Sequence, residues 1–316
     1  MNRCPITFEP CDQGRYSRAG LRLLSPRLTD LQDFPYSAAQ QRQEAMLRAG
    51  RISIQGIQPK LSVLLDVRQQ SFTLCDQRAR YIIKPQHAIY PHLPENEALT
   101  MRLAQSIGIE VPVHGLVYCQ DGTLSYFVKR FDRVGHNRKL AVEDFAQLSH
   151  RSRDTKYDSS MERLVTLLDR YCTFPVVEKA KLLTRCLFSF LTGNEDMHLK
   201  NFSLITRNDK VELAPAYDLL NTTLAFLVLG KPQAEIEEIA LPLKGRKKGL
   251  TSAAWLKYYA RERLQLTDKV IARIMERFRQ TISSWNTTIQ QSFLPQGQQD
   301  LYRELIDERQ SRLFLR

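Results

Sequence analysis

The sequence predicts an α+β protein with two lobes: a β-rich N-terminal lobe with one main helix (residues 1–130) and a mostly α-helical C-terminal lobe (residues 131–316). Before Phe131, apolar residues alternate with polar ones in several short runs, which is typical of strands. From Val142 onward they recur every three or four residues, which is typical of helices. A length of 316 residues suits two lobes, and ligand sites tend to lie where lobes meet.

The N-terminal half contains one predicted helix ahead of its strands. Residues 37–49 have helical spacing, with Ser37 as the N-cap and Gly50 as the terminating glycine. Residues 51–65 alternate around a Gly/Pro turn and predict a β-hairpin with a polar tip. A short strand is expected at 81–84.

The main helix and a second hairpin complete this lobe. The helix opens at Pro94 and has an apolar residue at every fourth position until Gly108 ends it. Strands 113–119 and 124–131 flank the turn 120–122, whose Asp-Gly pair is a strong hairpin signal. In the second lobe, helices are expected at 161–171, 177–192 and 270–285, with one hairpin at 202–213.

The composition excludes several classes of protein. With 43% hydrophobic and 25% charged residues, the chain is globular rather than disordered, collagen-like or coiled-coil. The start carries no apolar secretory signal, and the longest apolar run, 224–229, is far shorter than the roughly 20 residues of a membrane helix. Six cysteines without a C-x-x-C pair favour neither a metal site nor a disulfide framework. A soluble, cytoplasmic protein without membrane contact is expected.

The net charge of +12, from 46 Lys and Arg against 34 Asp and Glu, indicates a polyanionic or acidic partner. Nucleic acid, a membrane surface, nucleotide phosphates and an acidic protein all satisfy this requirement. The basic runs 150–153 and 244–248 could contact such a partner or lie in solvated loops. No helix-turn-helix, zinc-finger or RNP-like motif is present, which disfavours autonomous sequence-specific DNA binding.

The segment 193–201, between a predicted helix and a predicted strand, carries the strongest chemical signal. Asp196 and Asn201 have the spacing of the D-x-x-x-x-N pair in a kinase catalytic loop, in which the Asp accepts the proton of the attacking hydroxyl and the Asn holds Mg²⁺. A carboxylate can face the nucleophile, and an amide oxygen can hold a metal without adding charge. The same spacing also occurs in solvated turns, so it needs further support.

Asp218 supplies that support. It follows one short hairpin after Asn201, at the topological place of the metal-binding Asp in the kinase D-F-G element, with Leu219 in place of Phe. Oxygen ligands together with phosphate match the preference of Mg²⁺. The alternative is that Asp218 is the N-cap of the next helix; with Asp196 and Asn201 upstream, metal binding is the preferred hypothesis.

A kinase also needs a cation and a loop on the ATP phosphates. Lys84, on a short strand before the main helix, fits the cation by position, and the alternative is a solvated lysine on an edge strand. Residues 53–60 are the candidate loop. With a single glycine they match neither Walker A nor G-x-G-x-x-G, so an ordinary hairpin is the alternative.

From about Gly50 to Thr223 these segments resemble the HipA family of Ser/Thr kinase toxins. The motifs that carry the resemblance are Gly56-x-Gln58-Pro59-Lys60, Glu95-Asn96-Glu97-Ala98, Gly108-Ile109-x-Val111-Pro112, Arg130-Phe131-Asp132-Arg133, Glu143-Asp144-Phe145-Ala146-Gln147 with Lys156-Tyr157, and the segments around Asp196 and Asp218. The resemblance implies a protein-kinase-like fold of two lobes that binds ATP and Mg²⁺. It implies Asp196 as the catalytic base, and Asn201 and Asp218 as the Mg²⁺ ligands.

The resemblance also implies the ATP-binding residues. Lys84 would bind the phosphates, and Glu97, or alternatively Glu95, would orient it. The other implied positions are the phosphate-binding hairpin Gln55, Gly56, Ile57, Gln58, Pro59 and Lys60, the hinge Lys129, Arg130 and Phe131, and His198, Leu199, Lys200 and Tyr217.

The family autophosphorylates a serine beside the phosphate-binding loop, and Ser53 stands at that place. A group of about −2 charge there should repel the ATP phosphates or eject the loop from the cleft. Arg51 could receive the new phosphate. The alternative is a strand serine without a role.

The resemblance is greatest to HipT, the shorter kinase of the three-gene HipBST systems, because only about 50 residues precede the loop. It implies a small antitoxin similar to HipS, a DNA-binding antitoxin similar to HipB through which alone the chain would meet DNA, and an aminoacyl-tRNA synthetase as substrate. Tryptophanyl-tRNA synthetase is favoured and glutamyl-tRNA synthetase is the other option. Phosphorylation would stop tRNA charging, arrest growth and favour persistence.

The competing hypothesis is a non-catalytic, kinase-like scaffold that acts in a repression complex of antitoxin and DNA. A pseudokinase usually lacks one of the essential residues. Asp196, Asn201, Asp218 and Lys84 are all present, which argues against the scaffold.

Overall fold

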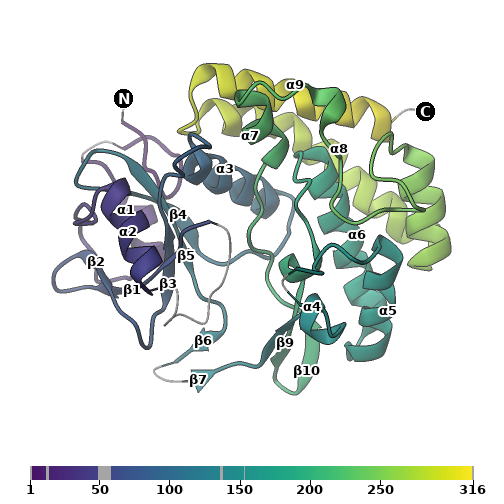
Figure 1. Cartoon of the computed structure of the whole chain (residues 1–316), viewed down its shortest axis with the longest axis horizontal. Coiled ribbons are helices and arrows are strands. Elements are labelled where there is room, and N and C mark those ends of the chain that lie inside the picture. Colours follow the sequence, from purple (N-terminus) through teal and green to yellow (C-terminus); the bar gives the residue numbers. More distant parts are fainter. Residues whose placement is uncertain (1, 12–13, 49–57, 136–137, 153, 315–316) are drawn as a thin grey trace. The chain divides into compact units, whose positions relative to one another are not determined.

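The computed structural model describes residues 2–11, 14–48, 58–135, 138–152 and 154–314. The chain divides into two compact units (Figure 1). Unit 1 comprises Met1–Leu99, Pro112–Asn137 and Thr287–Pro295. Unit 2 comprises Thr100–Val111, Arg138–Asn286 and Gln296–Arg316.

Unit 1 contains a five-stranded antiparallel sheet in the order β2-β1-β3-β5-β4. The strands are β1 (Leu61–Asp66), β2 (Ser71–Leu74), β3 (Tyr81–Lys84), β4 (His114–Tyr118) and β5 (Leu124–Lys129). The predicted strand before Pro85 and the predicted hairpin around the Asp-Gly turn are confirmed as β3 and as β4 with β5. In that turn Asp121 Oδ1 accepts hydrogen bonds from the Thr123 hydroxyl (2.6 Å) and backbone N–H (3.2 Å).

The helices of unit 1 are α1 (Arg18–Leu24), α2 (Ala38–Arg48) and the first part of α3 (Leu93–Ser106). The predicted N-cap of α2 is confirmed, since the Gln40 N–H donates to Ser37 Oγ at 3.2 Å. The predicted C-cap Gly50 lies outside the described residues. The prediction of a single helix in the first 50 residues is wrong, because Ser17 accepts a hydrogen bond from the Gly20 N–H and begins α1.

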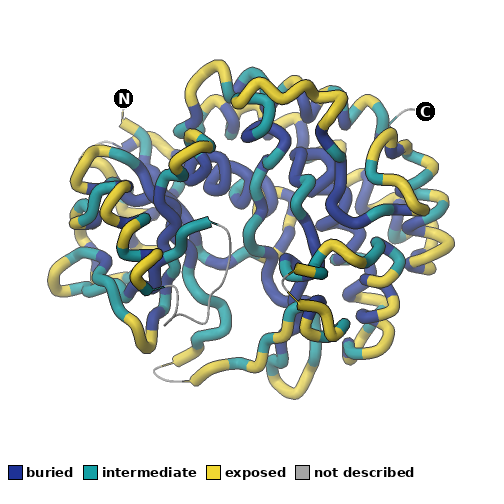
Figure 2. Tube along the Cα trace, viewed as in Figure 1, coloured by how far each residue is buried: buried dark blue, intermediate teal, exposed yellow. Residues whose placement is uncertain are grey.

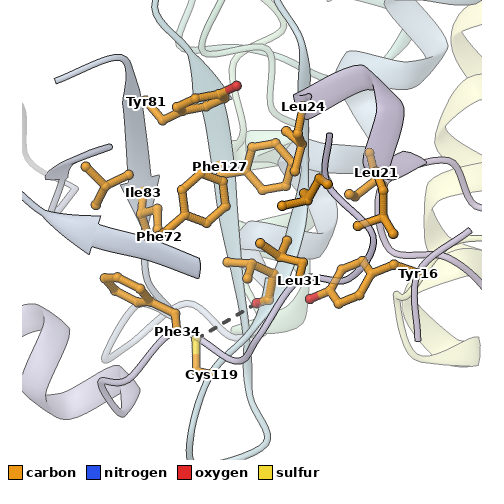
Figure 3. Close-up of a cluster of buried hydrophobic side chains, with 14 of the residues drawn as sticks. Tyr16, Leu21, Leu24, Leu31, Phe34, Phe72, Tyr81, Ile83, Cys119 and Phe127 are labelled. Atoms are coloured by element: carbon orange, nitrogen blue, oxygen red, sulfur yellow. Dashed lines mark hydrogen bonds between the residues drawn. The ribbon is translucent and has the colours of Figure 1, made fainter. Parts of the chain in front are cut away.

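The core of unit 1 is rich in aromatic residues (Figure 3). The ring centre of Phe72 on β2 lies 5.3 Å from that of Phe127 on β5 and 5.2 Å from that of Tyr81 on β3. All three side chains are nearly inaccessible to solvent. Aromatic pairs at these separations add to the hydrophobic stabilisation, so the sheet provides a rigid support for residues at its strand ends.

Unit 2 is mainly helical and carries a small antiparallel sheet in the order β10-β9-β8. The strands of unit 2 are β7 (Arg138–Lys139), β8 (Val142–Asp144), β9 (Ser203–Arg207) and β10 (Lys210–Leu213). Its helices are α4 (Phe145–Leu148), α5 (Met161–Tyr171), α6 (Pro175–Leu191), η1 (Leu199–Asn201), α7 (Thr222–Val228), η2 (Gln233–Glu235), η3 (Ala253–Arg263), most of α8 (Asp268–Gln290) and α9 (Gln296–Leu313). Unit 1 also contains β6 (Arg133–Val134). The predicted helices 161–171 and 177–192 and the hairpin 202–213 are confirmed, whereas β8 was not expected.

Helix α6 lies in the core of unit 2, and the tube of Figure 2 is dark blue along most of it. Phe188 packs edge-on against Trp285 at 5.7 Å between ring centres, and Phe190 lies 5.5 Å from Trp255. All six cysteines are free thiols. Within the described ranges, no helix is long and apolar enough to cross a membrane.

Candidate functional site

Lys84, the last residue of β3, is a buried charge paired with a carboxylate. Its Nζ lies 2.5 Å from Glu97 Oε1 on α3, and the two side chains are 3% and 2% exposed. The ammonium also lies 5.4 Å from the ring centre of Tyr126. Because β3 is flanked by β1 and β5, the alternative of a solvated lysine on an edge strand is wrong.

Glu95 has different partners. Its two carboxylate oxygens accept hydrogen bonds from Gln86 Nε2 at 2.8 and 2.9 Å. Its Oε1 also lies 3.5 Å from His92 Nδ1, and the interaction with this carboxylate raises the pKa of His92. Of the two glutamates that the sequence left open, the structure brings Glu97 to Lys84.

The expected hinge begins at Lys129, the last residue of β5. The Lys129 N–H donates to the Val113 carbonyl at 2.7 Å, and the Arg130 N–H donates to the Arg80 carbonyl at 2.8 Å. Burial alone would favour the neutral acid of Asp132, but two hydrogen bonds and the charge of Arg130 lower the pKa of that carboxyl. The backbone N–H groups of Lys129 and Arg130 therefore already donate hydrogen bonds within unit 1.

The expected phosphate-binding hairpin is described only in part. Gln58, Pro59 and Lys60 are half-buried and lead directly into β1. Ser53, Gln55, Gly56 and Ile57 lie outside the described residues.

In unit 2, the segment 193–201 forms a closed turn between α6 and β9. Asn201 Nδ2 donates to the Asp196 carbonyl at 2.8 Å, and the His198 N–H donates to the same oxygen at 2.8 Å. The Asn201 amide is thereby oriented with its nitrogen toward the turn, which leaves Oδ1 as a ligand atom. The two residues that the five-residue spacing singled out are therefore bonded to each other.

The Asp196 side chain is 42% exposed, and its two carboxylate oxygens have different contacts. Oδ1 accepts a hydrogen bond from Tyr157 Oη at 2.5 Å, whereas Oδ2 lies 3.9 Å from His198 Nε2. Lys156 Nζ lies 2.7 Å from that same Nε2. Burial lowers the pKa of His198, while burial and the charge of Asp196 raise the pKa of Tyr157, so Tyr157 stays a protonated donor.

The neighbours of this carboxylate have structural contacts of their own. Leu199 is fully buried, and its N–H donates to the Lys156 carbonyl at 3.3 Å. Lys200 Nζ lies 3.4 Å from Oδ2 of Asp144, the N-cap of α4. The Lys200 carbonyl accepts a hydrogen bond from Tyr217 Oη at 2.8 Å. Tyr217 therefore ties the segment that carries Asp218 to the turn.

Asp218 adopts the left-handed backbone conformation, with φ = 54°. For a residue with a Cβ this conformation costs about 1–2 kcal/mol, and such strain is often found at functional sites. The N-cap of α7 is Asn221, whose Oδ1 accepts a hydrogen bond from the Leu224 N–H at 2.8 Å. The alternative of Asp218 as the cap of this helix is therefore wrong.

Two charged residues of α6 that the sequence reasoning missed hold the chain that leads to Asp218. Arg185 Nη2 donates to the Ala214 carbonyl at 2.5 Å, and Glu178 Oε2 accepts from the Leu213 N–H at 2.9 Å. Both side chains are buried, and burial lowers the pKa of Arg185 to about 10. The signal available in the sequence was a glutamate and an arginine at helical spacing, seven residues apart, in a predicted helix rich in apolar residues.

The donor set fits Mg²⁺ bound together with a nucleotide. Across the described part of the chain, no group of three or more His, Cys, Asp or Glu side chains could hold a metal ion. Asn201 and Asp218 offer hard oxygen ligands, and Mg²⁺ commonly takes one or two protein ligands plus phosphate oxygens and water. The residues present therefore suit a metal that arrives with its phosphates.

Sequence comparisons connect the chain to kinases. Residues 52–285 match the model of the HipA-like C-terminal domain. A Haemophilus influenzae protein named "Putative kinase" is 28% identical over 279 residues, which cover 80% of this chain and 77% of that protein. The serine/threonine-protein kinase toxin HipA of Shewanella oneidensis is 32% identical over 191 residues, which cover 54% of this chain and 43% of HipA. The match thus spans less than half of that toxin.

Solved structures show the same fold. Shewanella oneidensis HipA, in its complex with HipB and operator DNA, superposes with a TM-score of 0.68 at 23% identity, over 90% of this chain and 72% of that one. The Helicobacter pylori proinflammatory kinase CtkA superposes with a TM-score of 0.54 at 15% identity, over 76% of this chain and 90% of that one. The predicted α+β, kinase-like fold is confirmed. Since the family model covers most of the sequence, the chain belongs to the HipA-like C-terminal domain family, whose relatives include named kinases and the kinase toxin HipA.

Proposed function

We propose that this chain is an ATP- and Mg²⁺-dependent Ser/Thr protein kinase that acts as the toxin of a bacterial toxin–antitoxin system. The observation that carries the proposal is the closed turn in which Asn201 bonds the Asp196 backbone while the Asp196 carboxylate stays exposed. Phosphoryl transfer needs such a base and such a metal ligand held in fixed geometry. The buried Lys84–Glu97 pair and the family membership support the proposal.

In the proposed reaction, the oxygen of a Ser or Thr hydroxyl forms a bond to the γ-phosphorus of ATP. Asp196 accepts the hydroxyl proton, and ADP leaves with the electron pair of the broken P–O bond. Lys84, oriented by Glu97, binds the phosphates. Asn201 and Asp218 would hold Mg²⁺, which supplies charge neutralisation on the phosphates when it is bound.

The remaining ATP-binding assignments rest on the resemblance. They are Gln55, Gly56, Ile57, Gln58, Pro59 and Lys60 for the phosphates, Lys129, Arg130 and Phe131 for the base, and His198, Leu199, Lys200 and Tyr217 near the transferred group. Ser53 is the proposed autophosphorylation site. Because Leu199 is buried and the Tyr217 hydroxyl bonds Lys200, these two are proposed to act by packing and by holding the loop.

We propose an aminoacyl-tRNA synthetase as the substrate, with tryptophanyl-tRNA synthetase favoured over glutamyl-tRNA synthetase. The HipT-like form and a small HipS-like antitoxin are proposed on the same resemblance. Shewanella oneidensis HipA was solved with HipB and operator DNA, which supports a DNA-binding antitoxin as a partner, with DNA contacted through it. We propose the cytoplasm as the location, since a synthetase and a DNA-binding antitoxin would act there.

Induction of the chain in a bacterial host, followed by growth measurement and phosphoproteomics, tests this function. The wild type should arrest growth and add phosphate to Ser or Thr of a synthetase and to Ser53. Asp196→Asn should do neither. Asp209→Asn, in the exposed turn of the β9–β10 hairpin, is the matched control and should behave as the wild type. Growth arrest by Asp196→Asn without new phosphosites would instead support the non-catalytic scaffold.

A further inference from the structure

Two adjacent residues before α5, Lys156 and Tyr157, contact the proposed catalytic turn through both of their side chains. Tyr157 Oη donates to Asp196 Oδ1 at 2.5 Å, and Lys156 Nζ lies 2.7 Å from His198 Nε2. The Leu199 N–H adds a backbone bond to the Lys156 carbonyl at 3.3 Å. The dipeptide thus contacts two side chains and the backbone of a turn that lies about 40 residues further along the chain.

Tyr157 distinguishes the two oxygens of the Asp196 carboxylate. With 42% exposure, an unsupported aspartate in water would sample several rotamers. The bond to Oδ1 selects one of them and leaves Oδ2 to accept a proton. The Tyr157 ring is itself held edge-on against His198, with ring centres 5.1 Å apart and an interplanar angle of 78°.

Lys156 determines which nitrogen of His198 carries the proton. An ammonium group can only donate, so His198 Nε2 must accept and the ring proton must lie on Nδ1. Nδ1 is buried and has no hydrogen-bond partner among the residues that the structure describes. Lys156 is therefore the polar contact that fixes the ring, and the ring in turn supports Tyr157.

We propose that Lys156 and Tyr157 are positioning residues for phosphoryl transfer: Tyr157 holds Asp196 Oδ1 so that Oδ2 faces the acceptor hydroxyl, and Lys156 fixes the His198 ring that supports Tyr157. The inference rests on the proposed kinase activity and adds to it. Neither side chain needs to touch ATP for this role. Their loss should therefore lower the rate of the chemical step and leave nucleotide binding unchanged.

Tyr157→Phe tests the hydroxyl, because it removes one hydrogen bond and keeps the ring. Misplacement of a catalytic group by a fraction of an ångström can cost up to about 100-fold. We expect kcat for protein phosphorylation to fall about 10- to 100-fold, with KM for ATP within about twofold of the wild type. Tyr171→Phe, a half-buried tyrosine at the end of α5, is the matched control and should leave both constants unchanged.

Lys156→Met tests the second contact. We expect a smaller fall in kcat than for Tyr157→Phe, since Met loses the donor to His198 but leaves the Tyr157 hydroxyl in place. Lys156→Arg retains a cationic donor and should restore most of the rate. The exposed Lys257→Met controls for the loss of one positive charge.

The possible outcomes distinguish the positioning role of Lys156 and Tyr157 from the kinase activity itself. If the wild type transfers phosphate and Asp196→Asn does not, but Tyr157→Phe retains the wild-type kcat, the positioning role is overturned and the kinase stands. A parallel loss of kcat, ATP affinity and melting temperature in Tyr157→Phe would show a merely structural residue and also overturn it. Absence of transfer by the wild type would overturn both.

Discussion

The positively charged Lys84 side chain is buried in unit 1. There the Glu97 carboxylate and the Tyr126 ring contact the ammonium group in place of water. Removing both ions from water is unfavourable, and their mutual attraction offsets this desolvation cost only while both ions are present. A buried ion pair adds little to stability compared with apolar residues, so its presence favours a functional reason for the charge. That reason is the proposed contact with ATP phosphates.

Lys84→Met should destabilise the protein by about 3–5 kcal/mol, because the buried Glu97 carboxylate loses its ion pair with Lys84. It should also abolish phosphoryl transfer. Urea unfolding and a transfer assay measure the two effects. The double variant Lys84→Met/Glu97→Leu should recover most of the stability but none of the activity. Recovery of activity in the double variant would contradict a role for Lys84 on the phosphates.

Glu195, next to Asp196, is a second perturbed group in unit 2. Burial, together with the negative charges of Asp196 and Glu237, raises the pKa of its carboxyl from 4.5 to about 7. Between these two values the folded protein holds a proton that the unfolded chain has released. The free energy of unfolding therefore falls as the pH rises through this window, and the penalty is complete above pH 7.

Glu195→Gln should remove this penalty. We expect the variant to be more stable than the wild type at pH 8, by about 1–3 kcal/mol, and to differ little from it below pH 5. Denaturant unfolding at the two pH values measures the difference, with the exposed Glu235→Gln as the control for losing a surface carboxylate. An equal difference at both pH values would show that Glu195 does not titrate in this range.

At the scale of elements, the N-terminus of α7 holds the start of the proposed catalytic turn. The Thr223 N–H and the Thr222 hydroxyl donate to the Gly193 carbonyl at 3.0 and 3.2 Å, and the Glu195 N–H donates to Thr222 Oγ1 at 2.9 Å. Gly193 adopts the left-handed backbone conformation, with φ = 68°. A Cβ there would lie 2.7 Å from Asn221 Oδ1 and closer still to Leu305 on α9.

Gly193→Ala should therefore cost both backbone strain and overpacking, about 2–5 kcal/mol in total, and should displace Asp196. Gly230→Ala is the matched control, because Gly230 is also left-handed (φ = 81°) but a Cβ there would meet nothing within 4 Å. The control should lose only about 1–2 kcal/mol, from backbone strain alone. Thermal unfolding measures both variants. Equal losses would contradict the close packing of Gly193.

Local pattern was sufficient for part of the fold, because periodicity and turn residues specify an element within a few positions. Strand β2 and helices η3 and α9 were not predicted. Helix α5 and strand β3 were predicted with the observed bounds. Helix α1 was missed because its seven residues carry too short a pattern, and β8 because its pairing with β9 joins distant parts of the sequence. The Arg185 contact to Ala214 and the choice of Glu97 over Glu95 depend on tertiary packing, which no sequence spacing contains.

At the scale of the whole molecule, the proposed reaction draws on both units. Unit 1 holds Lys84 and Glu97, and unit 2 holds Asp196, Asn201 and Asp218. Two lysines of the basic surface have partners within the chain: Lys247 pairs with Glu237 at 3.0 Å, and Lys248 donates to the Ala234 carbonyl at 2.8 Å. The rest of the positive charge is available to an acidic protein partner or to ATP.

The most direct test of the kinase proposal is transfer of the γ-phosphoryl group from radiolabelled ATP to protein, measured with the purified chain and with its Asp196→Asn variant in the presence of Mg²⁺. The wild type should incorporate label, and the variant should be slower by at least about 100-fold because the proton acceptor is lost. A chelator should stop the wild-type reaction. Equal incorporation by the wild type and by Asp196→Asn would contradict the central claim, as would a wild type that transfers no label.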